Sequence, residues 1–176
     1  MSSSARARRE RRLEAARGYL MLDMPGHALG ELDAIADPER CRFSINQLRG
    51  EALRRTGDYN TALSAYDRAL EEQPTDLCVL LGMADCYRHT DRLSRAVVAL
   101  RQAYRADPEQ PEVMYRLACC YALMGDKPQA LSWLGRAVRS DASLRALRPH
   151  DHDFDRLRND PDFQFILAAV QIGNRP

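Results

Sequence analysis

The sequence predicts an all-α fold, a right-handed α-solenoid of about four helix-turn-helix repeats closed by a C-terminal capping helix. A first observation is that alanine returns every 34 residues, at Ala28, Ala62, Ala96 and Ala130. A second is that small and apolar residues recur three and four positions apart within each repeat, which is typical of amphipathic helices. Small residues let paired helices approach closely, so a stack of such pairs buries one continuous core.

The first repeat begins in a basic segment. Residues 2–12 hold five arginines and one glutamate, and we interpret residues 1–9 as a basic N-terminal extension. An alternative is that this arm binds nucleic acid or an acidic partner. The first helix is expected from about Ala7 to Leu22. After a turn at Asp23–Gly26, the second helix is expected to end near Ala36.

The second repeat, about Cys41 to Pro74, departs from the common pattern in its first helix. Asn46 and Arg49 occupy slots that are apolar in the later repeats, whereas Ile45 and Leu48 lie one residue earlier. This shift predicts a slightly rotated helix whose apolar stripe is displaced by one position.

The third and fourth repeats complete an array that is expected to span residues 10–142. In the third repeat Asp91 stands where the others place a turn glycine, and the fourth restores it as Gly125. The fourth repeat shows the helical spacing most fully. The positions concerned are Met114, Leu117, Ala118 and Tyr121 in its first helix, then Ala130, Leu134 and Ala137 in its second.

Residues 143–176 are expected to form the cap that covers the exposed end of the array. Pro149 stops a fifth repeat soon after it begins. Asp160 and Pro161 then provide a good N-cap and a favourable first helical residue for one last helix. Its apolar residues are predicted to share one face, namely Phe163, Ile166, Leu167 and Val170.

The repeated slots resemble those of the tetratricopeptide repeat, whose period is also 34 residues. The match is best over Tyr59–Leu70, YNTALSAYDRAL, and Asp153–Phe163 looks like the ending of many bacterial arrays of this family. The resemblance implies that the first helix of each repeat lines a concave groove. It also implies that this groove holds a peptide or helix of a partner protein.

Residues expected to face this groove follow the packing stripe by one position. Four come from the second repeat, four from the third and two from the fourth. They are Gln47, Glu51, Arg54 and Arg55, then Leu81, Asp85, Arg88 and His89, and finally Tyr115 and Cys119. The arginines either hold acceptors of a partner or pair with nearby acids at helical spacing on a solvated face.

Composition and motifs argue against several other classes of protein. The chain of 176 residues has a net charge of only +1, so no global field steers it toward nucleic acid or membrane. We expect no cofactor and no catalysis, because phosphate loops, nucleophile elbows and paired-histidine motifs are missing from the sequence. The histidines and aspartates between His150 and Asp155 are interpreted as helix-capping groups, so no metal is expected.

The sequence therefore favours a non-catalytic protein-interaction module, a scaffold or adaptor. One alternative is a dedicated chaperone or assembly factor of a bacterial system, and another is nucleic-acid binding through the basic arm. A bacterial cytoplasmic location is the default expectation, because the sequence has neither a secretory signal nor an 18-residue apolar run. A homo-oligomer is possible, but nothing in the sequence indicates one.

Overall fold

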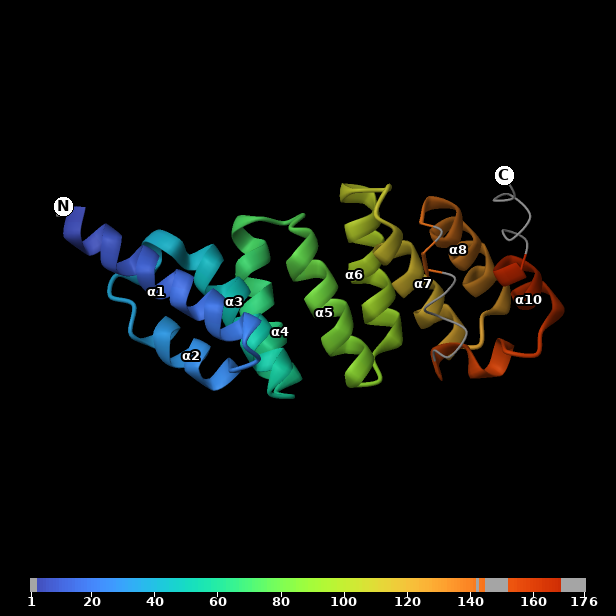
Figure 1. Ribbon diagram of the computed structural model, residues 1–176, viewed down its shortest axis with the longest axis horizontal. Coiled ribbons are helices and arrows are strands. Elements are labelled where there is room, and N and C mark those ends of the chain that lie inside the picture. Colours follow the sequence, from blue (N-terminus) through green and yellow to red (C-terminus); the bar gives the residue numbers. More distant parts are fainter. Residues whose placement is uncertain (1–2, 142, 145–151, 169–176) are drawn as a thin grey trace. The chain divides into compact units, whose positions relative to one another are not determined.

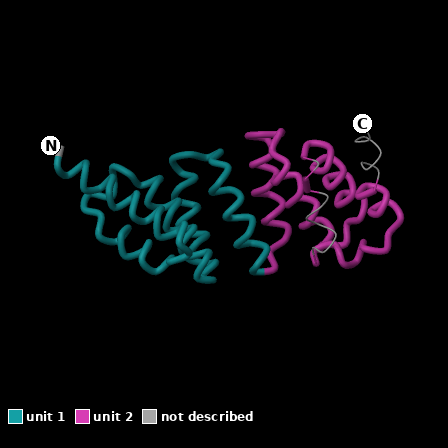
Figure 2. The backbone as a smooth tube through the Cα atoms, in the orientation of Figure 1, with its two compact units in different colours: residues 1–90 teal, residues 91–176 magenta. Residues whose placement is uncertain are grey.

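The computed structural model describes residues 3–141, 143–144 and 152–168. Every regular element in these ranges is helical, and none of the described helices is long and apolar enough to span a bilayer. The chain divides into two compact units, residues 1–90 and 91–176 (Figure 2). This division cuts through the third predicted repeat, and each unit is described by itself.

The first unit is built from helices that pack against their neighbours in the chain (Figure 1). Contacts join α1 to α2, α2 to α3, α3 to α4 and α4 to α5, as the repeat pattern predicts. The elements are α1 (Ser3–Met21), α2 (Pro25–Asp33), the 3-10 helix η1 (Pro38–Cys41), α3 (Arg42–Arg55), α4 (Tyr59–Glu72) and α5 (Leu77–His89). Because α1 begins at Ser3, most of the predicted basic extension forms its first turns.

The turns follow from local side-chain chemistry. Asp58 and Asp76 accept hydrogen bonds from the backbone N–H groups of Thr61 and Val79, which caps α4 and α5. Gly57 adopts a left-handed conformation with φ of 83° between α3 and α4. Asp91 has φ of 56°, so it takes the backbone conformation of the glycine that it replaces, which aspartate tolerates better than most residues.

Tyr66 is the central packing residue of the first unit. Its side chain is 1% exposed, and its ring lies against the α-carbons of Gly50 on α3 and Gly82 on α5. A Cβ atom at Gly50 would lie 2.5 Å from the ring, and one at Gly82 would lie 2.4 Å from the hydroxyl oxygen. Glycine at both positions therefore makes room for the aromatic ring of α4.

The second unit contains the remaining described helices. They are α6 (Leu93–Ala106), α7 (Pro111–Leu123), α8 (Lys127–Ser140), the 3-10 helix η2 (His152–Leu157) and α10 (Pro161–Ala168). The alanines of the repeating column are buried in both units, since Ala28, Ala62, Ala96 and Ala130 are all 0% exposed. Helix contacts join α6 to α7 and α7 to α8.

The C-terminal segment covers the end of the second unit, as the sequence predicts. η2 packs on α7 and α10 packs on α8. Phe154 of η2 links α7 to α10, because its ring centroid lies 5.8 Å from that of Tyr115 on α7 and 5.4 Å from that of Phe163 on α10. The Lys127 ammonium lies 2.6 Å from an oxygen of Asp160. Val170, which we placed on the same apolar face, lies outside the described residues.

Gly82→Ala is expected to destabilise the protein by about 1–3 kcal/mol, because the added methyl group overpacks the buried Tyr66 ring. Gly18→Ala is the matched control, since nothing lies within 4 Å of a Cβ atom at this glycine of α1. There the same substitution is expected to stabilise by about 0.5–1 kcal/mol. Urea unfolding measures both changes, and a Gly82→Ala variant at least as stable as wild type would contradict the packing of Tyr66.

Phe154→Ala is expected to cost about 3–5 kcal/mol, because it removes the aromatic side chain that joins η2 to α7 and α10. Phe165 on α10 is 71% exposed, so Phe165→Ala is expected to stay within about 0.5 kcal/mol. Thermal and urea unfolding of both variants distinguish a cap from a tail. Equal stability of Phe154→Ala and wild type would show that the segment contributes nothing to the second unit.

Candidate functional site

Eight of the ten predicted groove residues lie on α3 and α5, and we call this surface the α3/α5 face. It consists of Gln47, Glu51, Arg54, Arg55, Leu81, Asp85, Arg88 and His89. The two helices are in contact, and polar side chains bridge them. Arg54 Nη1 donates to Asp85 Oδ2 over 3.4 Å, and Gln47 Nε2 donates to Asp76 Oδ1 over the same distance.

Glu51 is the centre of the hydrogen bonds on this face. Its Oε1 accepts from Arg54 Nη2 at 2.8 Å and from Arg55 Nε at 2.6 Å. Its Oε2 accepts from Arg54 Nε at 3.0 Å and from the Tyr66 hydroxyl at 3.3 Å. The forked Arg54 contact is of the strong, geometrically specific kind. Through Tyr66, the same carboxylate is joined to the core.

Burial and hydrogen bonding act in opposite directions on the pKa of Glu51. Loss of solvent is the largest single effect and pulls the pKa upward, but hydrogen bonds from Arg54 and Arg55 outweigh it, so the pKa lies below its ordinary value. Burial likewise lowers the pKa of Arg54, yet the contact with Glu51 prevails and raises it. The pair is therefore ionised at neutral pH.

Two further contacts fix the edges of the α3/α5 face. Arg55 Nη1 donates to the backbone oxygen of Leu20 at 2.7 Å, which ties the end of α3 to the end of α1. The ring of His89 stacks on that of Tyr59, with 4.7 Å between centroids and 1° between planes. These contacts thus join the end of α3 to α1 and the end of α5 to α4.

The structure separates the predicted residues into two groups. Of the two alternatives for the arginines, pairing with nearby acids at helical spacing is the arrangement seen for Arg54 and Arg55. Arg88 and Leu81 are half-buried on α5. Tyr115 and Cys119 are only 2% and 4% exposed, and Phe154 of η2 packs against Tyr115. They therefore lie in the interior of the second unit and offer little surface to a partner.

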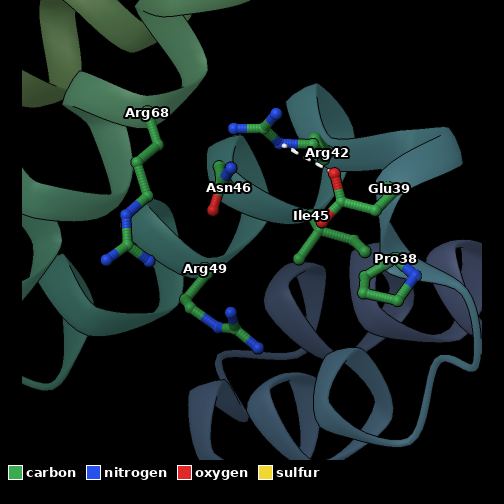
Figure 3. A pocket seen from close by; sticks show the side chains of 7 residues that line it. All are labelled: Pro38, Glu39, Arg42, Ile45, Asn46, Arg49 and Arg68. Atoms are coloured by element: carbon green, nitrogen blue, oxygen red, sulfur yellow. Dashed lines mark ion pairs between the residues drawn. The ribbon is translucent and has the colours of Figure 1, made fainter.

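A polar pocket in the first unit was not foreseen as a site. It is lined by Pro38, Glu39, Arg42, Ile45, Asn46, Arg49 and Arg68, and we call it the arginine pocket (Figure 3). The signal that could have found it was present in the sequence, because Asn46 and Arg49 stand in slots that are otherwise apolar. That Arg68 lines the same pocket follows only from the packing of α3 on α4, which the sequence does not show.

The chain belongs to the tetratricopeptide repeat family. The family pattern matches residues 53–100 and 91–148, which together are more than half of the sequence. Proteins of this family are built from interaction repeats that bind other proteins. The class of protein defined by the fold is thus a helical protein-interaction scaffold, as the sequence resemblance implied.

Curated relatives share the repeats within much longer chains. Cellulose synthase operon protein C of Pseudomonas fluorescens (strain SBW25) is 27% identical over 120 residues, 64% of this chain and 9% of that protein. The TPR repeat-containing thioredoxin TTL4 of Arabidopsis thaliana is 32% identical over 126 residues, 71% of this chain and 17% of that protein. The chain spans less than a fifth of the length of these relatives.

Solved structures show the same fold at low sequence identity. Residues 41 to the end of MamA from Desulfovibrio magneticus RS-1 match with a TM-score of 0.71 and 18% identity, covering 100% of this chain and 99% of that one. A tetratricopeptide repeat protein from Parabacteroides merdae matches with a TM-score of 0.67 and 18% identity, over 94% of this chain and 68% of that one. These similarities confirm the predicted α-solenoid fold.

Glu51→Gln is expected to lower the free energy of unfolding at pH 7 by about 1–3 kcal/mol, because hydrogen bonds to a charged acceptor are lost. The folded pKa of Glu51 is depressed, so its contribution is present above the ordinary carboxyl pKa of about 4.3 and is lost as pH falls through the folded value. The difference between wild type and variant should therefore shrink at acid pH.

The matched control is Glu10→Gln, which removes an exposed partner of Arg6 on α1. Surface ion pairs contribute at most about 1 kcal/mol, so this change is expected to be small. Urea unfolding at neutral pH and at roughly pH 2–3, well below the ordinary carboxyl pKa of about 4.3, measures both variants. A stability difference for Glu51→Gln that does not change with pH would contradict the role assigned to this carboxylate.

Proposed function

We propose that the protein is a non-catalytic scaffold or adaptor that binds a segment of a partner protein on the α3/α5 face. The observation that supports this most is the arrangement around Glu51, where side chains of α3 and α5 meet on one surface of the first unit. Groups held rigidly in place lose little entropy when a partner binds. The face therefore offers an ordered polar surface, which is what a scaffold needs.

The chemistry of the α3/α5 face favours a partner segment that carries both hydrogen-bond acceptors and apolar side chains. Arg54 and Arg55 already use part of their donor capacity on Glu51, so a partner would add acceptors to an ionised network. Leu81 is an apolar residue on the same face and is half-buried. We propose that it contacts an apolar side chain of the partner, with the charged groups setting orientation and specificity.

The ion pairs of the basic N-terminal segment favour protein binding over nucleic-acid binding, but they are less direct support than the α3/α5 face. Arg6 pairs with Glu10 at 2.7 Å, and Arg12 pairs with Glu31 of α2 at 2.7 Å. Two of the five arginines in residues 2–12 are thus paired with acids of the first unit. Cytoplasmic location and a chaperone-like task belong to the same proposal, since both are compatible with a scaffold.

Leu81→Asp is the sharpest test, because it places a charge on the α3/α5 face at a half-buried position. Val98 on α6 in the other unit is 64% exposed, and Val98→Asp makes the matched change elsewhere. Leu81→Asp is expected to weaken binding of the copurified partner at least tenfold, or about 1.4 kcal/mol. Val98→Asp should bind as wild type does.

Titration calorimetry with the purified partner measures both affinities, and circular dichroism checks that the variants are folded. Arg54→Glu is a poorer choice, since it leaves Glu51 beside a second acid and also affects folding. Equal binding by Leu81→Asp and Val98→Asp would move the partner surface away from α3 and α5.

A further inference from the structure

The arginine pocket lies within the first unit and shares no residue with the α3/α5 face. It is a hollow of about 300 Å³ formed by η1, α3 and α4. Three of its seven lining residues are arginines and one is a glutamate, so its lining carries a net charge of +2 (three positive, one negative). Figure 3 shows the arginine side chains extending around Asn46.

Asn46 is the most informative residue in the pocket. It is 7% exposed and is the buried polar residue of the described core. Its side chain has no hydrogen-bond partner among the described residues, although nearly all buried side-chain amides in proteins have one. The amide offers two donors and one acceptor. Its burial beside open space therefore points to a partner that comes from outside the chain.

The arginines around Asn46 have unused donor capacity. Arg68 on α4 forms no ion pair with the described residues. Arg42 approaches Glu39, Glu71 and Glu72 at 3.7, 3.7 and 3.5 Å, whereas a charge-assisted hydrogen bond is about 2.7–2.9 Å long. Arg49 differs, because its Nη2 lies 2.5 Å from Asp33 on α2. Arg68 can therefore offer its guanidinium to an anion, Arg42 can exchange its long ion pairs for one, and Arg49 is a fixed positive neighbour.

We propose that the arginine pocket binds a phosphate group through Arg42, Arg68 and the amide of Asn46. A tetrahedral oxyanion presents acceptors in several directions at once, and these donors reach the hollow from two helices. A planar carboxylate would satisfy fewer of them. The arginine donors of the lining favour an anion, and Pro38 and Ile45 add apolar walls. The site would act beside the partner-binding face, and the proposal does not depend on that function.

Phosphate binding is tested on the full chain with inorganic phosphate, at constant ionic strength kept with sodium chloride. Saturable stabilisation in a thermal melt, and heat of binding in calorimetry, are expected for wild type. Arg68→Ala should weaken binding at least tenfold, and it should fold because Arg68 is exposed. Arg95→Ala on α6 is the matched control, since it removes one exposed positive charge outside the pocket and should bind as wild type does.

Asn46→Leu separates binding from folding. Leucine restores the apolar residue that later repeats place in this slot, so the variant is expected to melt at or above the wild-type temperature without phosphate. It should nevertheless lose phosphate binding. O-phosphoserine with both ends blocked is titrated beside inorganic phosphate. Tighter binding of the ester would support a phosphorylated side chain as the source, and tighter binding of the free ion would support free phosphate.

The proposal is overturned by either of two results. One is that neither phosphate nor the ester stabilises wild type more than sodium chloride of the same ionic strength does. The other is that Arg68→Ala and Arg95→Ala respond to phosphate equally, which would mean that the anion acts through general charge screening. Unchanged phosphate affinity in folded Asn46→Leu would contradict the binding of phosphate by the Asn46 amide.

Discussion

The packing of Tyr66 against two glycines is the contact on which the first unit depends. A ring from α4 reaches the backbones of α3 and α5 only because Gly50 and Gly82 carry no side chain. The hydroxyl then donates to Glu51, so burial of the ring also positions the carboxylate that organises Arg54 and Arg55. Core packing and the polar face are therefore parts of one arrangement, and neither can be changed without the other.

The second unit meets a different physical requirement. Each repeat has an apolar face on both sides. The outer face of the last repeat has no neighbouring repeat, so another segment must cover it. η2 and α10 supply this cover through Phe154, Leu157 and Phe163, each 8% exposed or less. The same cover encloses Tyr115, which the repeat register alone would place in a groove. The last repeat therefore exposes different positions from the inner repeats, although all the repeats share one sequence pattern.

The first unit also shows where the repeat pattern was broken. The one-residue shift that brought Ile45 and Leu48 into the core, at 3% and 8% exposure, left Asn46 and Arg49 facing other surroundings. Arg49 reaches α2 through Asp33, while Asn46 lines the arginine pocket. A buried amide without a partner costs stability. Its presence in an otherwise apolar slot is the reason for assigning a ligand to this pocket.

The sequence by itself determined the helix pairs, their turns, the buried alanine column and the nature of the cap, because these follow from local spacing, glycine and aspartate conformations and the need to bury small residues. It also placed Glu51, Arg54 and Asp85 near one another through the register. Only the tertiary structure decided that Tyr66 of α4 donates to Glu51 of α3, that Phe154 covers Tyr115, and that Arg68 of α4 stands beside Asn46 of α3. These depend on side chains from different helices, whose distances no repeat period specifies.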